Sequence, residues 1–353
     1  MRRVIPLVLA AVAFAALPGV VFAAPGAKQK LPSRKQAEAM LQAASDAANI
    51  FYSADTRPYH LIAAVHYTLG NVVSTGQYEL LWAAPDIWHE GFDMQYLGLR
   101  QQEVDVARGE KRYRLRSTAA LPLPLWLTRQ KVHDFYRTLL TDKQRPLNRV
   151  FWGDDKRQVC VETGSDYFPT TTCFDPATGD ALSSAMRPRW NNPATASSFS
   201  LPPGLPGALA DNFTSVGNRR FPIHIFYRAL DVQIDITVTL LSTSQHFGKG
   251  TFDTRPDAVV SDWCPQPDYG PQPRLSPPPV VTTSPPGHLL AYSYLVQTDG
   301  SLTEIEAERS GGREVDATVE KWLRNAKMRI ASCHGKPIEY RSMFTPPTRI
   351  IAR

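Results

Sequence analysis

Residues 59–96, YHLIAAVHYTLGNVVSTGQYELLWAAPDIWHEGFDMQY, decide the fold of this chain. Three segments of this stretch are rich in β-branched and aromatic side chains, which favour strands: 59–69, 78–82 and 87–96. In the last of them polar and apolar residues roughly alternate, which indicates a sheet with one face in water. Gly70-Asn71 and Ala84-Pro85-Asp86 supply turns between the segments. The stretch therefore predicts an antiparallel meander.

Strand-like segments continue on the C-terminal side of this meander. They cover residues 100–106, 112–116, 149–152, 158–162, 172–174, 221–227 and 232–241. Apolar residues recur at helical spacing within 35–52 and 122–140, and these two stretches predict helices. The Pro-, Asn- and Ser-rich residues 187–206 predict a long loop. We therefore expect residues 31–264 to form one mostly antiparallel sheet with a few helices.

Composition indicates a second unit after this sheet. A length of 353 residues favours two domains, and 43% hydrophobic with 20% charged residues suits a globular chain. Nine of the 22 residues in 265–286 are proline, including Pro277-Pro278-Pro279. Such a run favours extended polyproline II with a reach of up to about 70 Å, so we interpret it as a spacer. The alternative is a ligand for the aromatic groove of another protein.

Residues 287–353, after the spacer, have the pattern of a small domain. Two strands, 289–297 and 302–309, flank a turn that contains Asp299-Gly300, a strong hairpin signal. An apolar helical face follows, then a turn at 334–337 and a third strand at 338–344. The fold class expected for the whole chain is α+β: a large, mostly antiparallel sheet domain with a few helices and a small strand–strand–helix–strand domain.

Residues 287–347 resemble the C-terminal domain of TonB-type energy transducers. The motifs that carry the resemblance are Val296 with Asp299-Gly300 and Leu302, Ser310-Gly311-Gly312, Val315-Asp316-Ala317 and Gly335-Lys336-Pro337-Ile338. The resemblance implies β-augmentation, in which an edge strand pairs with a peptide from an outer-membrane receptor or another envelope protein. The candidate strand is Ile338, Glu339, Tyr340, Arg341, Ser342, Met343 and Phe344, with alternate residues facing the helix or solvent. The alternative is that this strand only closes its sheet.

The N-terminus predicts export. Arg2 and Arg3 precede an uncharged apolar stretch, and Val21-Phe22-Ala23 places small residues at a cleavage site, so residues 1–23 are expected to be a signal peptide. This predicts a periplasmic or secreted protein. The alternative is that residues 4–24 remain as an inner-membrane anchor, which a TonB-type transducer needs to couple force to the proton gradient.

Export changes the interpretation of the four cysteines, because an oxidising compartment favours disulfides. Cys160 and Cys173 flank a run that reads as a hairpin, and a bond between them leaves Cys264 to pair with Cys333. The cysteine spacing does not match a zinc site.

The larger domain shows a weaker resemblance, to periplasmic lipoprotein-carrier half-barrels. It is carried by the long antiparallel sheet with interposed helices, including Gly76-Gln77-Tyr78 and Cys173-Phe174-Asp175. The resemblance implies a curved sheet that offers an apolar concavity to a lipid or other hydrophobic ligand. An apolar cavity in the large domain would favour this function, whereas a filled interior with an exposed C-terminal edge strand would favour peptide binding.

Catalysis is not indicated by any local motif. His60, His66 and His224 fall in predicted strands and are expected to be structural, and His89 and Glu90 should point to opposite faces of a strand. Asp154-Asp155 fits a solvated turn. We predict no catalytic, cofactor or metal residues, and a net charge of +6 without a Lys/Arg run does not indicate nucleic-acid binding.

Taken together, these patterns predict an exported, non-enzymatic TonB-like module that binds an envelope partner. The alternatives are a carrier of a hydrophobic ligand and a hydrolase with a dispersed site.

Overall fold

The structure is a computed structural model. It describes residues 30–96, 98–117, 122–134, 147–153, 157–164, 169–186, 206–243, 246–265, 279–282 and 288–346. The predicted signal peptide 1–23, the alternative anchor 4–24 and Asp154-Asp155 lie outside the described residues, as do most of the loop 187–206 and of the spacer 265–286.

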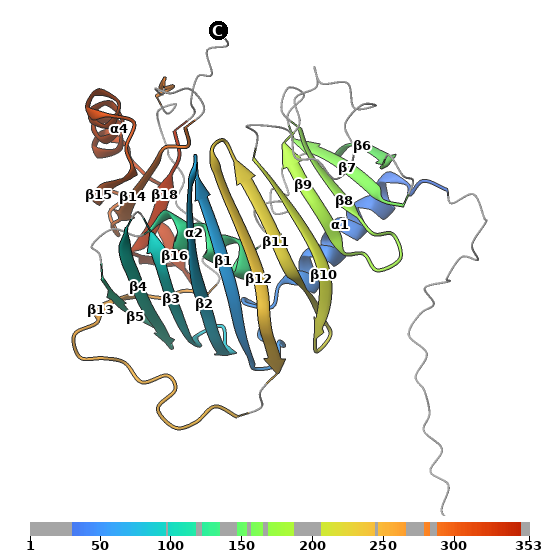
Figure 1. The fold of residues 1–353 in the computed structure, drawn as a ribbon, viewed down its shortest axis with the longest axis horizontal. Helices are drawn as coiled ribbons and strands as arrows, with labels where there is room; N and C mark the ends of the chain where they lie inside the picture. The colour runs from blue at the N-terminus through green and yellow to red at the C-terminus, as the bar shows by residue number, and fades with distance from the viewer. Residues whose placement is uncertain are drawn as a thin grey trace, which may run out of the picture. The chain divides into compact units, whose positions relative to one another are not determined.

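One large antiparallel sheet dominates the described residues (Figure 1). Its first five strands are β1 (Tyr59–Leu69), β2 (Val72–Ala84), β3 (Ile87–Tyr96), β4 (Leu99–Arg108) and β5 (Lys111–Arg116). The others are β6 (Leu147–Trp152), β7 (Val159–Gly164), β8 (Pro169–Phe174), β9 (Ala181–Met186), β10 (Gly207–Val216), β11 (Arg219–Ala229), β12 (Val232–Thr243) and β13 (Val259–Asp262). The order is β13-β5-β4-β3-β2-β1-β12-β11-β10-β9-β8-β7-β6.

The topology follows from short turns. Strands β1 to β5 pair as consecutive hairpins, which is the meander that residues 59–116 predict. A second run of hairpins from β6 to β12 brings the chain back, and β12 pairs with β1, with Val65 opposite Ile236. Most connections are local, so the β1–β12 pair is the contact that joins the two runs into one sheet.

Two helices cover one face of this sheet, which we call the inner face. Helix α1 (Arg34–Ala48) begins at a capping box of Ser33 and Gln36, and α2 is Leu123–Asp134. Both lie on the same side of the strands in Figure 1. They share a core with inner-face residues that include Tyr59, Leu61, Ala63, Val65 and Tyr67 of β1. Predicted helix residues 135–140 lie outside the described residues.

The C-terminal segment forms a separate three-stranded sheet, ordered β15-β14-β18. Its elements are β14 (Ala291–Val296), β15 (Leu302–Arg309), α4 (Arg313–Asn325) and β18 (Tyr340–Phe344). Between α4 and β18 lies a hairpin of β16 (Ala331–Cys333) and β17 (Lys336–Ile338). Tyr292, Tyr294 and Val296 pack against Val319 and Leu323 of α4. The expected sheet-rich α+β architecture is confirmed.

The predicted third strand of this unit, 338–344, is wrong in two respects. It is two strands, because Ile338 pairs back onto Ala331 in the β16–β17 hairpin and only 340–344 pair with β14. Its second face does not point to solvent, because Met343 belongs to the core of the large sheet, together with Ala291 of β14. Phe344 faces α4, where its ring stacks on Trp322 with centroids 4.9 Å apart.

All four cysteines are bonded, in the pairing expected from the sequence. Cys160 and Cys173 lie opposite each other on β7 and β8, with their sulfur atoms joined. Cys264 follows β13 and is bonded to Cys333 of β16, so this bond links the edge of the large sheet to the C-terminal unit. A second link is Asp231, which accepts hydrogen bonds from the guanidinium of Arg309 and from the backbone N–H of Leu289.

Replacing Gly76 by alanine is expected to lower the free energy of unfolding by about 1–3 kcal/mol, because a Cβ there would lie 2.6 Å from the Asp93 carbonyl oxygen of the neighbouring strand. Gly91 on β3 is the matched control, because a Cβ at that position meets no atom within 4 Å. Gly91→Ala should be neutral or stabilise by up to about 1 kcal/mol. Urea denaturation of both variants checks this, and equal effects would contradict it.

Candidate functional site

Five large aromatic side chains gather on the inner face and form what we call the aromatic cluster: Phe51, Tyr59, Trp82, Trp88 and Trp263. The register of β1, β2 and β3 places Tyr59 opposite Trp82 and Trp82 opposite Trp88. Ring centroids are 5.2 Å apart for Tyr59 and Trp82, and 5.1 Å apart for Trp88 and Trp263. The cluster is therefore a wall of stacked and edge-to-face rings built by consecutive strands.

Polar atoms within the aromatic cluster are only partly hydrogen-bonded. Trp82 Nε1 donates to the Phe51 carbonyl at 2.9 Å, and Trp263 Nε1 donates to the Pro85 carbonyl at 3.0 Å. Tyr59 Oη and Trp88 Nε1 are buried and have no hydrogen-bond partner among the described residues. Burial raises the pKa of Tyr59 well above its usual value, so its hydroxyl stays protonated. Two donors thus remain unused in an apolar setting.

Three carboxylates occupy the inner face beside the aromatic cluster. The register of β3 and β4 puts Glu90 directly opposite Asp105, and Phe92 opposite Glu103. All three carboxylates are at most 2% exposed. Like charges opposite each other in a sheet repel, and burial adds a desolvation cost, so cations must accompany them.

Four arginines supply these cations, and with the three carboxylates they form the charged cluster. Arg112, Arg114 and Arg116 alternate along β5, and Arg129 comes from α2. Arg114 Nε lies 3.2 Å from Asp105 Oδ1, and Arg116 Nε lies 3.4 Å from Glu103 Oε2. The guanidinium of Arg129 contacts all three carboxylates. Burial alone would raise the pKa of Asp105, but Arg112 and Arg129 outweigh it and hold that pKa well below its usual range.

Helix α2 is held on the inner face by charged as well as apolar contacts. Leu123, Leu125, Leu127 and Val132 are buried, but so are Lys131 and His133. Lys131 Nζ lies 4.2 Å from the ring centroid of Tyr227. His133 Nε2 is 2.6 Å from Tyr78 Oη and 3.2 Å from Glu90 Oε2. Burial lowers the pKa of His133, so the ring tends to be neutral near pH 7. The helix lacks one continuous apolar stripe.

The aromatic and charged clusters meet at Arg112. Its guanidinium carbon lies 5.7 Å from the ring centroid of Trp88 and 5.8 Å from that of Trp263, within cation–π range. A buried apolar wall therefore adjoins a buried group of guanidinium ions. This combination suits binding of a molecule with an apolar part and a polar end.

The predicted partner strand is connected to this site through one residue. Arg341 of β18 is 12% exposed and its guanidinium contacts Glu304 of β15. Burial and the neighbouring Arg116 and Arg112 lower the pKa of Arg341 to about 10. Glu339 lies between β17 and β18, and Tyr340 and Ser342 are half-buried on β18. The role of 338–344 in pairing with a partner strand stays a prediction.

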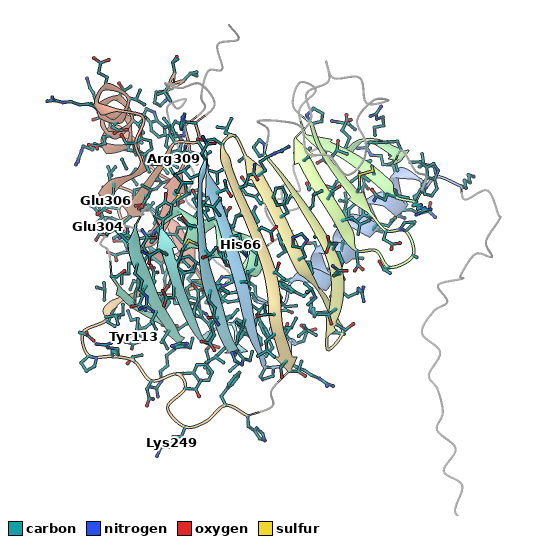
Figure 2. The ribbon with its side chains drawn as sticks, viewed as in Figure 1. His66, Tyr113, Lys249, Glu304, Glu306 and Arg309 are labelled. Atoms are coloured by element: carbon teal, nitrogen blue, oxygen red, sulfur yellow. A yellow bond between two sulfur atoms is a disulfide. The ribbon has the colours of Figure 1, made fainter. Side chains whose placement is uncertain are left out.

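The histidines of the predicted strands lie outside the aromatic and charged clusters. His60 Nε2 is 2.7 Å from Glu79, and His224 lies 3.1 Å from both Asp211 and Asp235. His66 lies on the outer face of β1 (Figure 2). Glu90 points inward to α2 and His89 to the other face, as alternation requires. Within the described residues, no group of three His, Cys, Asp or Glu side chains could hold a metal ion.

The outer face of the sheet carries an open groove of about 550 Å³ over β2 to β5. Gly91 leaves space at its floor, and Arg255 from the segment after β12 lines it. Two of its carboxylates already have side-chain partners, because Glu79 contacts His60 and Asp93 forms an ion pair with Arg100. The inner-face clusters are therefore the stronger candidate site.

The charged cluster was missed from the sequence, although a signal for it exists. Glu103 and Asp105 alternate with apolar residues, and Arg112, Arg114 and Arg116 do so one hairpin later. Acidic and basic residues with the same period on two adjacent predicted strands indicate charge pairs across the strands. Periodicity did not show that this charged face is the buried one.

Comparisons with known proteins give distant similarities. No family model and no curated protein matches the chain. A LolA superfamily protein from Nitrosomonas europaea aligns over 62% of this chain and 97% of its own, with 12% identity and a TM-score of 0.37. A putative outer membrane lipoprotein-sorting protein domain from Vibrio parahaemolyticus aligns over 61% and 95%, with 9% identity and a TM-score of 0.35. The MucA/MucB complex of Pseudomonas aeruginosa aligns over 74% and 82%, with 15% identity and a TM-score of 0.27.

TM-scores below 0.5 are too low to carry an argument. The expected resemblance of residues 287–347 to TonB-type domains has no support in them. Within the described part of the chain, no helix has the length and apolar character needed to cross a membrane.

Proposed function

We propose that this chain is an exported, non-enzymatic carrier that binds a lipid or another hydrophobic ligand on the inner face of its large sheet. The observation that carries the proposal is the aromatic cluster with its two unused donors, Tyr59 Oη and Trp88 Nε1. A buried donor without a partner costs about 1–3 kcal/mol. In a permanent core such donors are rare, whereas apolar ligand sites typically carry a few polar groups that orient the ligand.

The described residues show this face closed, because the side chains of the aromatic cluster other than Trp263 are at most 1% exposed. A ligand can enter only if a covering element moves. Helix α2 is the element suited to this, because its Arg129 binds the sheet through ion pairs with Glu90, Glu103 and Asp105. A buried ion pair adds little net stability, because its attraction mostly offsets the cost of removing both charges from water. When α2 leaves the inner face its charges are hydrated again, so its departure costs less free energy than that of an apolar helix with the same buried surface area.

Decanol, a neutral amphiphile, tests the proposal. We expect saturable binding of one molecule per chain, seen as a change in tryptophan fluorescence, because Trp82, Trp88 and Trp263 all line the site. Tyr59→Phe should weaken decanol binding about 3- to 10-fold, since it removes one hydrogen bond. The same change should leave the free energy of unfolding unchanged or raise it by up to about 1 kcal/mol, because a buried unpaired hydroxyl is removed.

Tyr113→Phe is the matched control, because Tyr113 alternates with the arginines along β5 and so belongs to the opposite face of the sheet. Tyr113→Phe should change neither the affinity for decanol nor the free energy of unfolding. Absence of saturable decanol binding by the unmodified protein would contradict the proposed function. Equal affinities of Tyr59→Phe and the unmodified protein would place the ligand outside the aromatic cluster.

A further inference from the structure

The charged cluster contains more positive than negative charge. Among the described residues it holds Arg112, Arg114, Arg116 and Arg129 against three carboxylates, and each arginine is at most 15% exposed. A fifth guanidinium, that of Arg341, comes from β18, on the strand face that it shares with Met343, which packs into the core of the large sheet. Arg112 and Arg116 are close enough to Arg341 to lower its pKa. The partner of Arg341 is Glu304, which is 55% exposed. Solvent therefore screens the attraction between this carboxylate and the guanidinium of Arg341. Buried charge of one sign in excess is costly unless an anion accompanies it.

Contacts inside the charged cluster also indicate an excess of positive charge. Asp105 is shared by Arg112, Arg114 and Arg129, and it is the only carboxylate that Arg112 contacts among the described residues. Neither oxygen of Glu103 accepts a hydrogen bond from the residues that the structure describes, although Arg129 Nη2 lies 3.1 Å from Oε1. Burial raises the pKa of Glu103, which weakens its contribution as a counter-charge. Burial and the adjacent Arg112 lower the pKa of Arg114 to about 9.

The charged cluster also has a hydrogen-bond donor available for an anion. Arg112 Nε is buried and has no hydrogen-bond partner in the described part of the chain. The same guanidinium lies over Trp88 and Trp263 of the aromatic cluster. An anionic group at Arg112 would therefore have an apolar wall directly beside it.

We infer that the ligand is an amphiphile with an anionic headgroup, which Arg112 and Arg341 bind while its apolar tail lies against the aromatic cluster. This inference rests on the proposed carrier function and specifies its ligand class. A carboxylate and a phosphate share the required chemistry, because both accept paired hydrogen bonds from guanidinium groups. The headgroup would also link the large sheet to the C-terminal sheet through Arg341.

Four ten-carbon probes and inorganic phosphate distinguish an anionic amphiphile from a neutral one, a cationic one and a free anion. All are measured at pH 7.5 and below the concentration at which micelles form. Decanoate and decyl phosphate should bind at least about tenfold more tightly than decanol, and decyltrimethylammonium more weakly than decanol. The advantage of the anions should fall as salt is raised from 50 to 500 mM. Inorganic phosphate should compete only weakly, because it lacks the tail.

Arg341→Gln should reduce the affinity for decanoate and decyl phosphate about 5- to 10-fold and leave decanol binding unchanged. Arg324→Gln is the matched control, because it makes the same charge change at a side chain on α4 that is 65% exposed. Equal binding of decanol and the anions would overturn this inference and leave the carrier function standing. Failure of all probes to bind would overturn both. Phosphate binding as tight as that of decyl phosphate would assign a free-anion site and contradict an amphiphile.

Discussion

Asp105→Asn is expected to lower the free energy of unfolding by about 3–5 kcal/mol, the range found when one partner of a buried ion pair is removed. Asp105 is fully buried and is the shared anion of Arg112, Arg114 and Arg129. An amide of the same shape leaves these arginines without that charge, while the backbone and the volume stay nearly the same. Urea denaturation at pH 7, followed by far-UV circular dichroism, measures the change.

Asp257→Asn is the control for loss of one carboxylate charge. Asp257 pairs with Arg255, and both side chains are more than half exposed, so a loss of at most about 1 kcal/mol is expected. A loss below 1 kcal/mol for Asp105→Asn would contradict a buried charged cluster.

The pH dependence gives a second check with a definite sign. Arginines lower the pKa of Asp105 in the folded protein, so its stabilising contribution is complete above the unfolded pKa of about 4. That contribution is lost as the pH falls through the lower folded value. The difference in stability between the unmodified protein and Asp105→Asn should therefore narrow progressively below about pH 4. A constant difference down to pH 2 would assign the effect to packing.

Removing the Cys264–Cys333 bond by the double change Cys264→Ser and Cys333→Ser is expected to cost about 4 kcal/mol. The two residues are 69 positions apart, and the loop-entropy estimate for a cross-link of that size gives this value. The bond also tethers the C-terminal unit to the end of β13, so its loss should loosen that unit first. Denaturation of the oxidised protein and of the serine variant measures the effect.

The Cys160–Cys173 bond is the internal comparison. It spans only 13 positions between two strands that already pair, so Cys160→Ser with Cys173→Ser should cost about 3 kcal/mol. A larger loss for this pair than for Cys264–Cys333 would show that strain or residual structure, and not loop length, decides the stabilisation.

Much of the sheet could be predicted because its contacts are local. In residues 59–116, turns such as Gly70-Asn71 separate segments of β-branched and aromatic residues, and each strand pairs with the next. Strands β9, β10 and β13 were missed: β10 begins at Gly207, directly after a Pro- and Ser-rich stretch that predicted a loop.

The C-terminal unit shows where local patterns fail. Residues 338–344 look like one strand, but His334 and Gly335 both have positive φ and form a tight turn that pairs Ile338 with Ala331. Tyr340 to Phe344 are then free to pair with β14. The helical face of α4 was visible in the sequence, whereas the burial of Met343 against the large sheet was not, because it depends on residues far away in the chain.

In the candidate site, local sequence patterns and tertiary packing decide different features. The sequence by itself determined the alternation of Glu103 with Asp105 and of Arg112 with Arg114 and Arg116, since a strand period of two places each set on one face. Only the tertiary structure decided that this face is buried, that Arg129 of α2 lies over it, and that Arg341 joins it. Periodicity is a property of neighbouring residues, whereas burial and charge excess depend on which distant elements pack together.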